Sequence, residues 1–260
     1  KEYQMQHYKY SNLPVNIITD IEIIENNVWI FSQMLKKPIL IVNLIDMSVS
    51  YMNFDIPMKY EDFGFTRTIQ RKGHIYFATR EENKILLGDI DCKKRKIGYQ
   101  LLEQLKYVNC IGFEESLYIL GALKNGMSAL LQFDINSKKI IEIYELQKTV
   151  VNQNMSYNYT QMIGYEDNVI FLPNVVKQVI VFNLKDKKEE IISYPKKFYY
   201  DTNKLKEGLF WYYQISEKYL YFFPHLSEQI LCLNLEGNSI DVLDVEINLE
   251  EYNPILKKMN

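Results

Sequence analysis

The sequence predicts an all-β protein in which one four-stranded unit is repeated. Three observations support this prediction. Short apolar runs rich in Val, Ile, Leu, Phe and Tyr recur along the 260 residues, a turn containing Asn or Asp follows every second run, and a more polar stretch follows each turn. Runs of this length bounded by polar turns have the composition of β-strands, and their regular recurrence indicates a repeat architecture.

The repeat is visible in two sets of apolar runs. The first set is VWIFS, IYFAT, LYILG, VIFLP and LYFFP, and the second set is ILIVNL, ILLGDI, LLQFDI, VIVFNL and ILCLNL. In the second set an Asn or Asp precedes the final Leu or Ile, and it suits a turn because its side chain bonds the local backbone. These turn residues are Asn43, Asp89, Asp134, Asn183 and Asn234, at intervals of 46, 45, 49 and 51 residues. The spacing predicts five copies.

Four antiparallel strands are expected within each copy. A mixed strand comes first (FTRTIQ, NCIGF, TQMIGY, LFWYYQI), the two apolar strands follow, and a more polar strand comes last (VSYMNF, IGYQLL, IIEIYEL, EIISYP, SIDVLDV). Helical content should be negligible, and the final EEYNPILKKMN is expected to be a short helix or a tail. The predicted repeats cover residues 16–58, 65–102, 107–146, 159–195 and 208–247 of a single domain spanning 1–260.

A period of about 45 to 50 residues with four strands per unit resembles the β-propeller superfold, in which each unit is a blade. The resemblance covers residues 16–247 and is to kelch- or WD-like blade repeats in general. No Gly-Gly pair occurs as in kelch repeats, and neither Trp29 nor Trp211 precedes Asp as in the WD motif, so no subfamily is matched. Five blades are expected, with six as the alternative. A β-sandwich is the other architecture with short strands at regular spacing.

The N-terminal stretch offers an extra strand. Residues 3–10 alternate polar with aromatic or apolar side chains. Such a strand would join the C-terminal segment and close the ring, since a closed ring leaves no free sheet edge. The chain begins with Lys1, which leaves room for an upstream signal or anchor and for membership of a longer chain.

Composition argues against several classes of function. A net charge of −3 from 33 acidic and 30 basic residues gives no basic footprint for nucleic acid. Three scattered cysteines without a Cys-x-x-Cys pair predict neither a disulfide framework nor a zinc cluster. The three histidines are far apart in the sequence, so no metal or other cofactor is predicted. No apolar run reaches the roughly 18 residues of a membrane span, so no membrane insertion within this chain is expected.

The candidate binding residues lie in long connections between the predicted blades. Loops of about 12 residues or more are uncommon in compact domains and are often functional. The connections at 147–159 and 196–208 flank the fourth repeat and are rich in Tyr and Asn, which combine apolar area with hydrogen-bonding groups. Because both residue types are abundant along the whole chain, the alternative is that the cluster reflects this general bias. The predicted ligand-binding residues are Asn154, Tyr157, Tyr159, Phe198, Tyr199, Tyr200 and Asp201.

The leading functional hypothesis is a non-enzymatic recognition module, without catalytic residues, that binds a protein or a glycan through loops on one propeller face. The alternative is a glycosidase-like carbohydrate-active enzyme, as some five-bladed propellers are. Such an enzyme needs two carboxylates facing each other across a bond. Asp20 and Glu22 lie on the first predicted inner strand, whereas FTRTIQ has no carboxylate, which weakens this alternative. A structural spacer is the third hypothesis, and it predicts no concave polar site.

Overall fold

The computed structural model describes residues 18–32, 38–54, 66, 68–81, 84–113, 115–149, 159–173, 176, 178–199, 210–224 and 229–244. The chain divides into two compact units, Lys1–Ser156 and Tyr157–Asn260. The strand expected at 3–10 and the tail expected at 250–260 lie outside the described residues. The single-domain organisation and the number of blades in a complete ring stay predictions.

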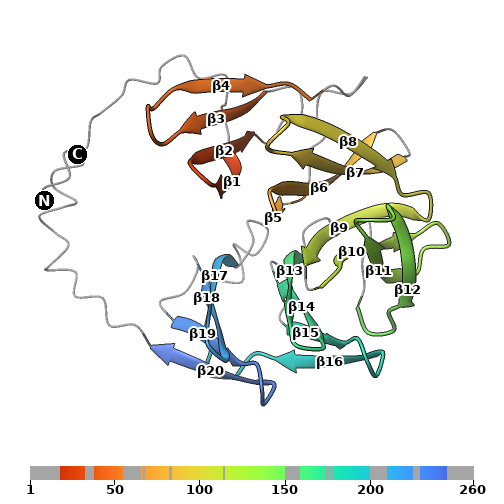
Figure 1. Ribbon diagram of the computed structural model, residues 1–260. Helices are drawn as coiled ribbons and strands as arrows, with labels where there is room; N and C mark the ends of the chain where they lie inside the picture. The colour runs from red at the N-terminus through yellow and green to blue at the C-terminus, as the bar shows by residue number, and fades with distance from the viewer. Residues whose placement is uncertain are drawn as a thin grey trace, which may run out of the picture. The chain divides into compact units, whose positions relative to one another are not determined.

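The unit Lys1–Ser156 contains three sets of four antiparallel strands, and within each set the strands follow one another in chain order (Figure 1). We call these sets blades 1 to 3. Blade 1 is β1 (Ile18–Ile24), β2 (Asn27–Ser32), β3 (Ile39–Asn43) and β4 (Val49–Met52); blade 2 is β5 (Ile69–Arg71), β6 (His74–Glu81), β7 (Lys84–Asp91) and β8 (Lys96–Leu101); blade 3 is β9 (Leu105–Phe113), β10 (Leu117–Leu123), β11 (Ser128–Asp134) and β12 (Lys139–Glu145).

The unit Tyr157–Asn260 contains two further sets with the same strand order, blades 4 and 5. Blade 4 is β13 (Tyr159–Tyr165), β14 (Asn168–Pro173), β15 (Gln178–Asn183) and β16 (Lys188–Ser193); blade 5 is β17 (Phe210–Ser216), β18 (Tyr219–Pro224), β19 (Gln229–Asn234) and β20 (Ser239–Asp244). The described residues of both units contain strands and turns but no helix. The predicted all-β class and the predicted four-stranded repeat unit are therefore confirmed.

Apolar side chains from consecutive blades form the cores. Trp29 and Phe31 of blade 1 pack in one buried cluster with Ile75 and Phe77 of blade 2. Blades 2 and 3 share a second cluster, and blades 4 and 5 share a third. Because side chains alternate between the two faces of a strand, the middle strands of blade 2 contribute to two clusters at once. Ile75 and Phe77 lie in one cluster, and Tyr76 and Ala78 lie in the other. This explains why these middle strands are continuous apolar runs in the sequence.

The opposite face of blade 1 is also apolar. The strand registers place Ile21 and Ile23 of β1 on the same face as Val49 and Tyr51 of β4. All four side chains are exposed, Ile23 by 64 %.

The third and fourth strands of every blade are joined by the same kind of turn. An Asn or Asp at the end of the third strand accepts a hydrogen bond from a backbone N–H two or three residues later, as in Asn43 with Ile45 (2.8 Å). In blade 2 this acceptor is Asp91, bonded to the backbone of Lys94 at 2.9 Å. The prediction that Asp89 fills this position was wrong by two residues, because β7 extends to Asp91 opposite His74.

A residue with left-handed backbone lies four positions after each of these turn acceptors. These residues are Met47, Arg95, Lys138, Lys187 and Asn238, with φ between 47° and 57°. Two of them also reach the preceding blade. The guanidinium of Arg95 donates to the hydroxyl of Ser50 on β4 at 3.1 Å, and the amide of Asn238 donates to the carboxylate of Glu190 on β16 at 2.7 Å.

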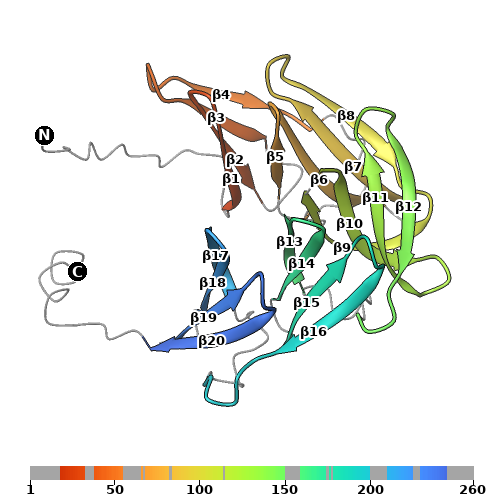
Figure 2. The ribbon, with the colours of Figure 1, turned by 60° about the horizontal axis from the view of Figure 1, so that its bottom comes forward.

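The first strands also share an irregularity. In β1, β9, β13 and β17, the pairing with the second strand slips by one residue at equivalent positions. Such β-bulges bend a strand and re-aim the side chains next to them. In Lys1–Ser156 the first strands β1, β5 and β9 are neighbours, as Figure 2 shows. The side chains just after the bulge in β1 therefore face the first strand of the next blade.

The packing of blades 1 and 2 leads to a prediction about two glycines of blade 2. Gly88 lies opposite Phe77, and a Cβ at this position would overlap three atoms of the fully buried Phe77 ring. We expect Gly88→Ala to lower the free energy of unfolding by about 1–3 kcal/mol through overpacking. Gly98→Ala is the matched control, because its Cβ would meet only ordinary contacts. Urea denaturation of both variants tests this, and equal midpoints would contradict the packing described.

Candidate functional site

The segment that follows β16 presents an aromatic side chain on a fixed backbone. Phe198 is buried in the core of the second unit, and its ring meets the Tyr194 ring edge to face at 5.6 Å. The next residue, Tyr199, is 78 % exposed. We call residues 196–199 the tyrosine shoulder, because a buried ring and an exposed ring stand side by side in the chain.

Hydrogen bonds to blade 5 hold the shoulder in place. The backbone N–H of Tyr199 donates to the side-chain oxygen of Gln229 at 2.9 Å, and the amide of Gln229 donates to Asp244 at 2.7 Å. The ammonium of Lys197 reaches the backbone oxygen of Val242 at 3.4 Å. A backbone fixed in this way presents the Tyr199 ring with little conformational entropy left to lose on binding.

The structure places three of the seven predicted binding residues. Tyr199 is exposed, whereas Tyr159 and Phe198 are buried and contribute to packing; the Tyr159 ring meets the Phe171 ring edge to face at 5.7 Å. The remaining predicted residues, Asn154, Tyr157, Tyr200 and Asp201, lie outside the described part of the chain. Within the described residues, the predicted site is therefore represented by the tyrosine shoulder.

A second polar group lies between the first strands of blades 1 and 2. Asp20 and Glu22 project from the same face of β1, toward Thr68, which immediately precedes β5. The Thr68 hydroxyl lies 3.0 Å from Asp20 Oδ2 and 3.0 Å from Glu22 Oε1, and the Thr68 backbone N–H donates to Asp20 Oδ2 at 2.7 Å. We call these three residues the Thr68 cluster.

Burial and charge shift the Glu22 titration in this cluster. Desolvation is the larger cause and the neighbouring Asp20 the second, and together they outweigh the Thr68 hydrogen bond and raise the pKa of Glu22 to about 7. Sequence reasoning singled out both carboxylates but missed Thr68, which is only 2 % exposed. The signal for it was weak, since Thr is an ordinary β-branched residue in the predicted inner strand FTRTIQ.

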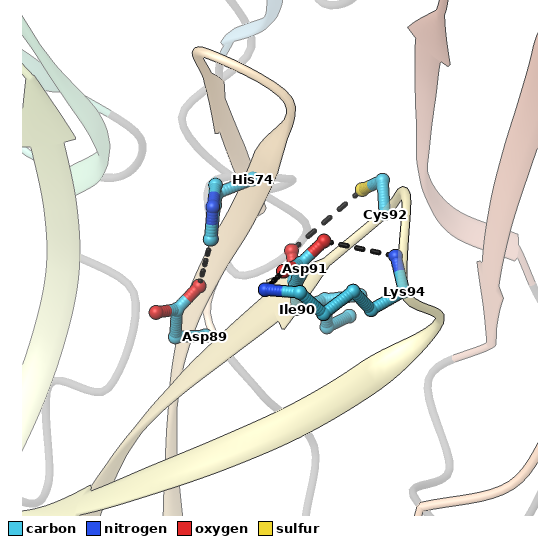
Figure 3. Close-up of polar contacts among 6 residues, drawn as sticks. All are labelled: His74, Asp89, Ile90, Asp91, Cys92 and Lys94. Atoms are coloured by element: carbon cyan, nitrogen blue, oxygen red, sulfur yellow. Dashed lines mark hydrogen bonds and ion pairs between the residues drawn. The ribbon is translucent and has the colours of Figure 1, made fainter.

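A third polar group lies on blade 2, where Figure 3 shows one residue of β6, three residues of β7, and Cys92 and Lys94 from the turn that follows. His74 Nδ1 donates to Asp89 Oδ1 at 2.6 Å, and Lys94 Nζ donates to Asp91 Oδ2 at 2.9 Å (Figure 3). The hydrogen bonds from Lys94 lower the pKa of Asp91 to about 2. Burial, followed by nearby carboxylates, raises the pKa of the Cys92 thiol to about 12, so this thiol is a poor nucleophile at neutral pH.

A small pocket adjoins Asp89 between blades 2 and 3. Its polar lining comes from Tyr76, Asp89, Gln100 and Lys138, and its cavity volume is about 30 Å³. That is room for roughly two water molecules, far below the ~300 Å³ of a typical small-molecule site. Among the described residues, no group of three or more His, Cys, Asp or Glu side chains is arranged to hold a metal ion.

The described part of the chain contains no helix with the length and apolar character needed to cross a membrane.

The four-stranded sets, their chain order and their shared apolar faces define the chain as a β-propeller protein, and comparison with solved structures supports this class. The WD40 repeats of RRP9 match with a TM-score of 0.61 at 9 % sequence identity, over 88 % of this chain and 63 % of that chain. The Pan2 WD40 domain of Neurospora crassa matches with a TM-score of 0.54 at 10 % identity, over 87 % of this chain and 65 % of that chain.

A chain of the nidogen/laminin complex also matches, with a TM-score of 0.56 at 8 % identity, over 88 % of this chain and 80 % of that chain. No protein-family model and no curated protein matches the sequence. At this level of identity the likeness shows the fold alone. The chain spans less than two thirds of the RRP9 and Pan2 chains that it matches.

The tyrosine shoulder leads to a prediction about stability, in which a buried and an exposed aromatic residue should have different effects. We expect Phe198→Ala to lower the free energy of unfolding by about 3–5 kcal/mol, because it leaves a cavity in the core of blades 4 and 5. Tyr199→Ala should change it by less than about 0.5 kcal/mol, as is usual for an exposed position. Guanidinium denaturation of the two variants gives both values. A large loss in Tyr199→Ala would show that the exposed ring is structural after all.

Proposed function

We propose that this β-propeller is a non-enzymatic recognition module that binds a protein partner through the loops around the tyrosine shoulder. The observation that carries the proposal is the exposed Tyr199 ring on a backbone fixed by Phe198 and Gln229. Tyr is enriched among residues that dominate binding energy, since its ring supplies apolar area and its hydroxyl a hydrogen bond. The predicted residues Asn154, Tyr157, Tyr200 and Asp201 belong to the same proposal.

The solved structures support the proposal in a general way. Two of the matched chains are WD40 repeats or a WD40 domain, and a third comes from a complex of two proteins. These properties belong to the matched proteins, and propellers carry many unrelated functions. A glycan is the second kind of partner that a Tyr- and Asn-rich loop suits, because sugars stack on aromatic rings and bond amides.

A carbohydrate-active enzyme is the second candidate function, and the Asp20–Glu22 pair is the observation in its favour. Pairs of carboxyl groups whose environments differ are a common source of acid and base catalysts. Both carboxyl groups, however, lie beside each other on one strand and contact the same Thr68 hydroxyl. This arrangement differs from two carboxylates facing each other across a scissile bond.

The proposal predicts that one exposed tyrosine matters and another does not. The tagged full chain is used to capture proteins from cell extract and to probe a glycan array, with hydrolysis of the same glycans followed in parallel. Tyr199→Ala, and more so the triple variant with Tyr157→Ala and Tyr200→Ala, should weaken the binding seen with the unaltered chain by about 10-fold or more. Tyr51→Ala is the matched control, since Tyr51 is an exposed tyrosine of blade 1.

Retained binding in the Tyr199 variants, with unchanged affinity for the captured partner, would refute the shoulder as the contact site. Hydrolysis of a glycan that Glu22→Gln abolishes would replace the recognition module by the enzyme. Binding to the array without hydrolysis would identify a glycan rather than a protein as the partner.

A further inference from the structure

We propose that the Thr68 cluster is a proton-sensitive contact between blades 1 and 2, in which the folded chain holds one proton on Glu22 at mildly acidic pH and loosens the contact when that proton leaves. The contact concerns the packing of two blades and is independent of the proposed partner. The proposal follows from the number of protons that the side chains of Asp20, Glu22 and Thr68 need to form their hydrogen bonds.

The hydroxyl of Thr68 carries one proton and can donate it to one acceptor only. Yet its oxygen lies 3.0 Å from a carboxyl oxygen of Asp20 and 3.0 Å from one of Glu22. If both carboxyl groups were ionised, one of these short contacts would join two acceptor oxygens. Both contacts are hydrogen bonds when Thr68 donates to one carboxylate and the other carboxyl group, which is protonated, donates to Thr68.

Glu22 is the carboxyl group that holds this proton. Asp20 accepts from the Thr68 backbone N–H at 2.7 Å and from the Ile21 backbone N–H at 3.1 Å, in addition to the Thr68 hydroxyl. Three donors therefore point at Asp20, which suits a carboxyl group that only accepts hydrogen bonds. The carboxyl group of Glu22 instead meets the Thr68 hydroxyl, and its pKa is raised to about 7 by burial and by Asp20.

The groups around Glu22 come from both blades. β1 itself contributes Asp20, and β2 contributes the buried indole of Trp29, the cross-strand neighbour of Glu22. From blade 2 come Thr68 and the Cys92 thiol, whose own pKa is raised in part by Glu22. The cation of β5, Arg71, lies over the Phe113 ring of blade 3 instead. Within the described residues, these neighbours of Glu22 include no cation that would stabilise its ionised form.

Blades 4 and 5 contain the same contact without an ionisable carboxyl group. The Tyr213 hydroxyl of β17 donates to the side-chain oxygen of Gln161 on β13. The strand registers make Gln161 the counterpart of Asp20, since each follows the bulge of its first strand, and make Tyr213 the counterpart of Thr68. This position of the repeat therefore holds a hydroxyl contact between consecutive blades in both cases. Of these two contacts, the one between blades 1 and 2 involves carboxyl groups.

The direction of the pH effect follows from the shift. The ordinary pKa of a glutamate carboxyl group is 4.5, and that of Glu22 is raised to about 7 in the folded chain. Between these two pH values the folded chain binds more protons than the unfolded chain, so stability falls as the pH rises. The contribution of Glu22 is complete below about pH 4.5 and is lost as the pH passes through about 7. This is opposite to the usual behaviour of a salt-bridged carboxylate.

The test compares the unaltered chain with Glu22→Gln, whose amide can donate to Thr68 at every pH. Thermal unfolding is measured at intervals from pH 5 to pH 8. We expect the midpoint of Glu22→Gln to rise relative to the unaltered chain by at least about 3 °C across this range, since all other titrating groups are shared. Glu145→Gln, at an exposed position of β12, is the matched control and should give a constant difference.

A second measurement needs no variant. In a chain labelled with ¹³C at glutamate carboxyl carbons, the Glu22 signal should titrate near pH 7. The amide hydrogen of Thr68 should exchange about 10-fold faster at pH 8 than at pH 6 after correction for intrinsic exchange, because the contact loosens. A Glu22 titration near its ordinary pH, or a parallel pH dependence in the unaltered and Glu22→Gln chains, would overturn the proposal.

Discussion

Burial of apolar sheet faces between consecutive blades is the constraint on which the rest of the structure depends. An apolar sheet face left in water costs free energy, and repeat units reduce this cost by stacking. Three buried clusters illustrate this constraint. The first surrounds Phe77, the second lies between blades 2 and 3, and the third surrounds Phe222. Each cluster contains side chains from two consecutive blades. Among the described residues, each of these cores is therefore shared by two blades.

This constraint decides where polar chemistry is tolerated. The middle strands of blade 2 serve two cores, and their polar pair, His74 with Asp89, lies near one end of β6 and β7. Other polar contacts collect at the first strands and in the connections. The two contacts at the first strands, Thr68 with the carboxyl groups of blade 1 and Tyr213 with Gln161, occupy the same position in the repeat. In the connection after β16, the polar aromatic side chain of Tyr199 is exposed, whereas the side chain of its neighbour Phe198 is buried in the core.

The repeat could be predicted from the sequence because it depends on local composition. The predicted apolar runs at 28–32 and 39–44 coincide within a residue with β2 and β3. The position of the turn in blade 2 was misjudged because ILLGDIDCKK offers two aspartates two residues apart, and only strand pairing with His74 selects Asp91. Composition favoured Asp89, since the other copies place a Leu or Ile after the acceptor.

The candidate sites were less predictable, because their definition depends on contacts between repeats. In the shoulder, Phe198 and Tyr199 are adjacent aromatic residues of similar size, and only the packing of blades 4 and 5 decides which is buried. Asp20 and Thr68 come from different copies of the repeat, so no motif within one copy joins them. The assignment of a proton to Glu22 depends on the distances between the Thr68 hydroxyl and the two carboxyl groups. No sequence pattern supplies these distances.

The left-handed residue that ends each turn between third and fourth strands has one further consequence. This backbone conformation is unfavourable for residues with a Cβ, except Asn and Asp, and natural to glycine. Four of the five positions carry Met, Arg or Lys, and only blade 5 uses Asn. Each turn lies in a different blade, so effects at distant turns should combine additively. Substitution of Arg95 or Asn238 would also remove a hydrogen bond to the preceding blade. The chain thus retains several independent sites at which thermostability could be engineered without altering a core or a binding surface.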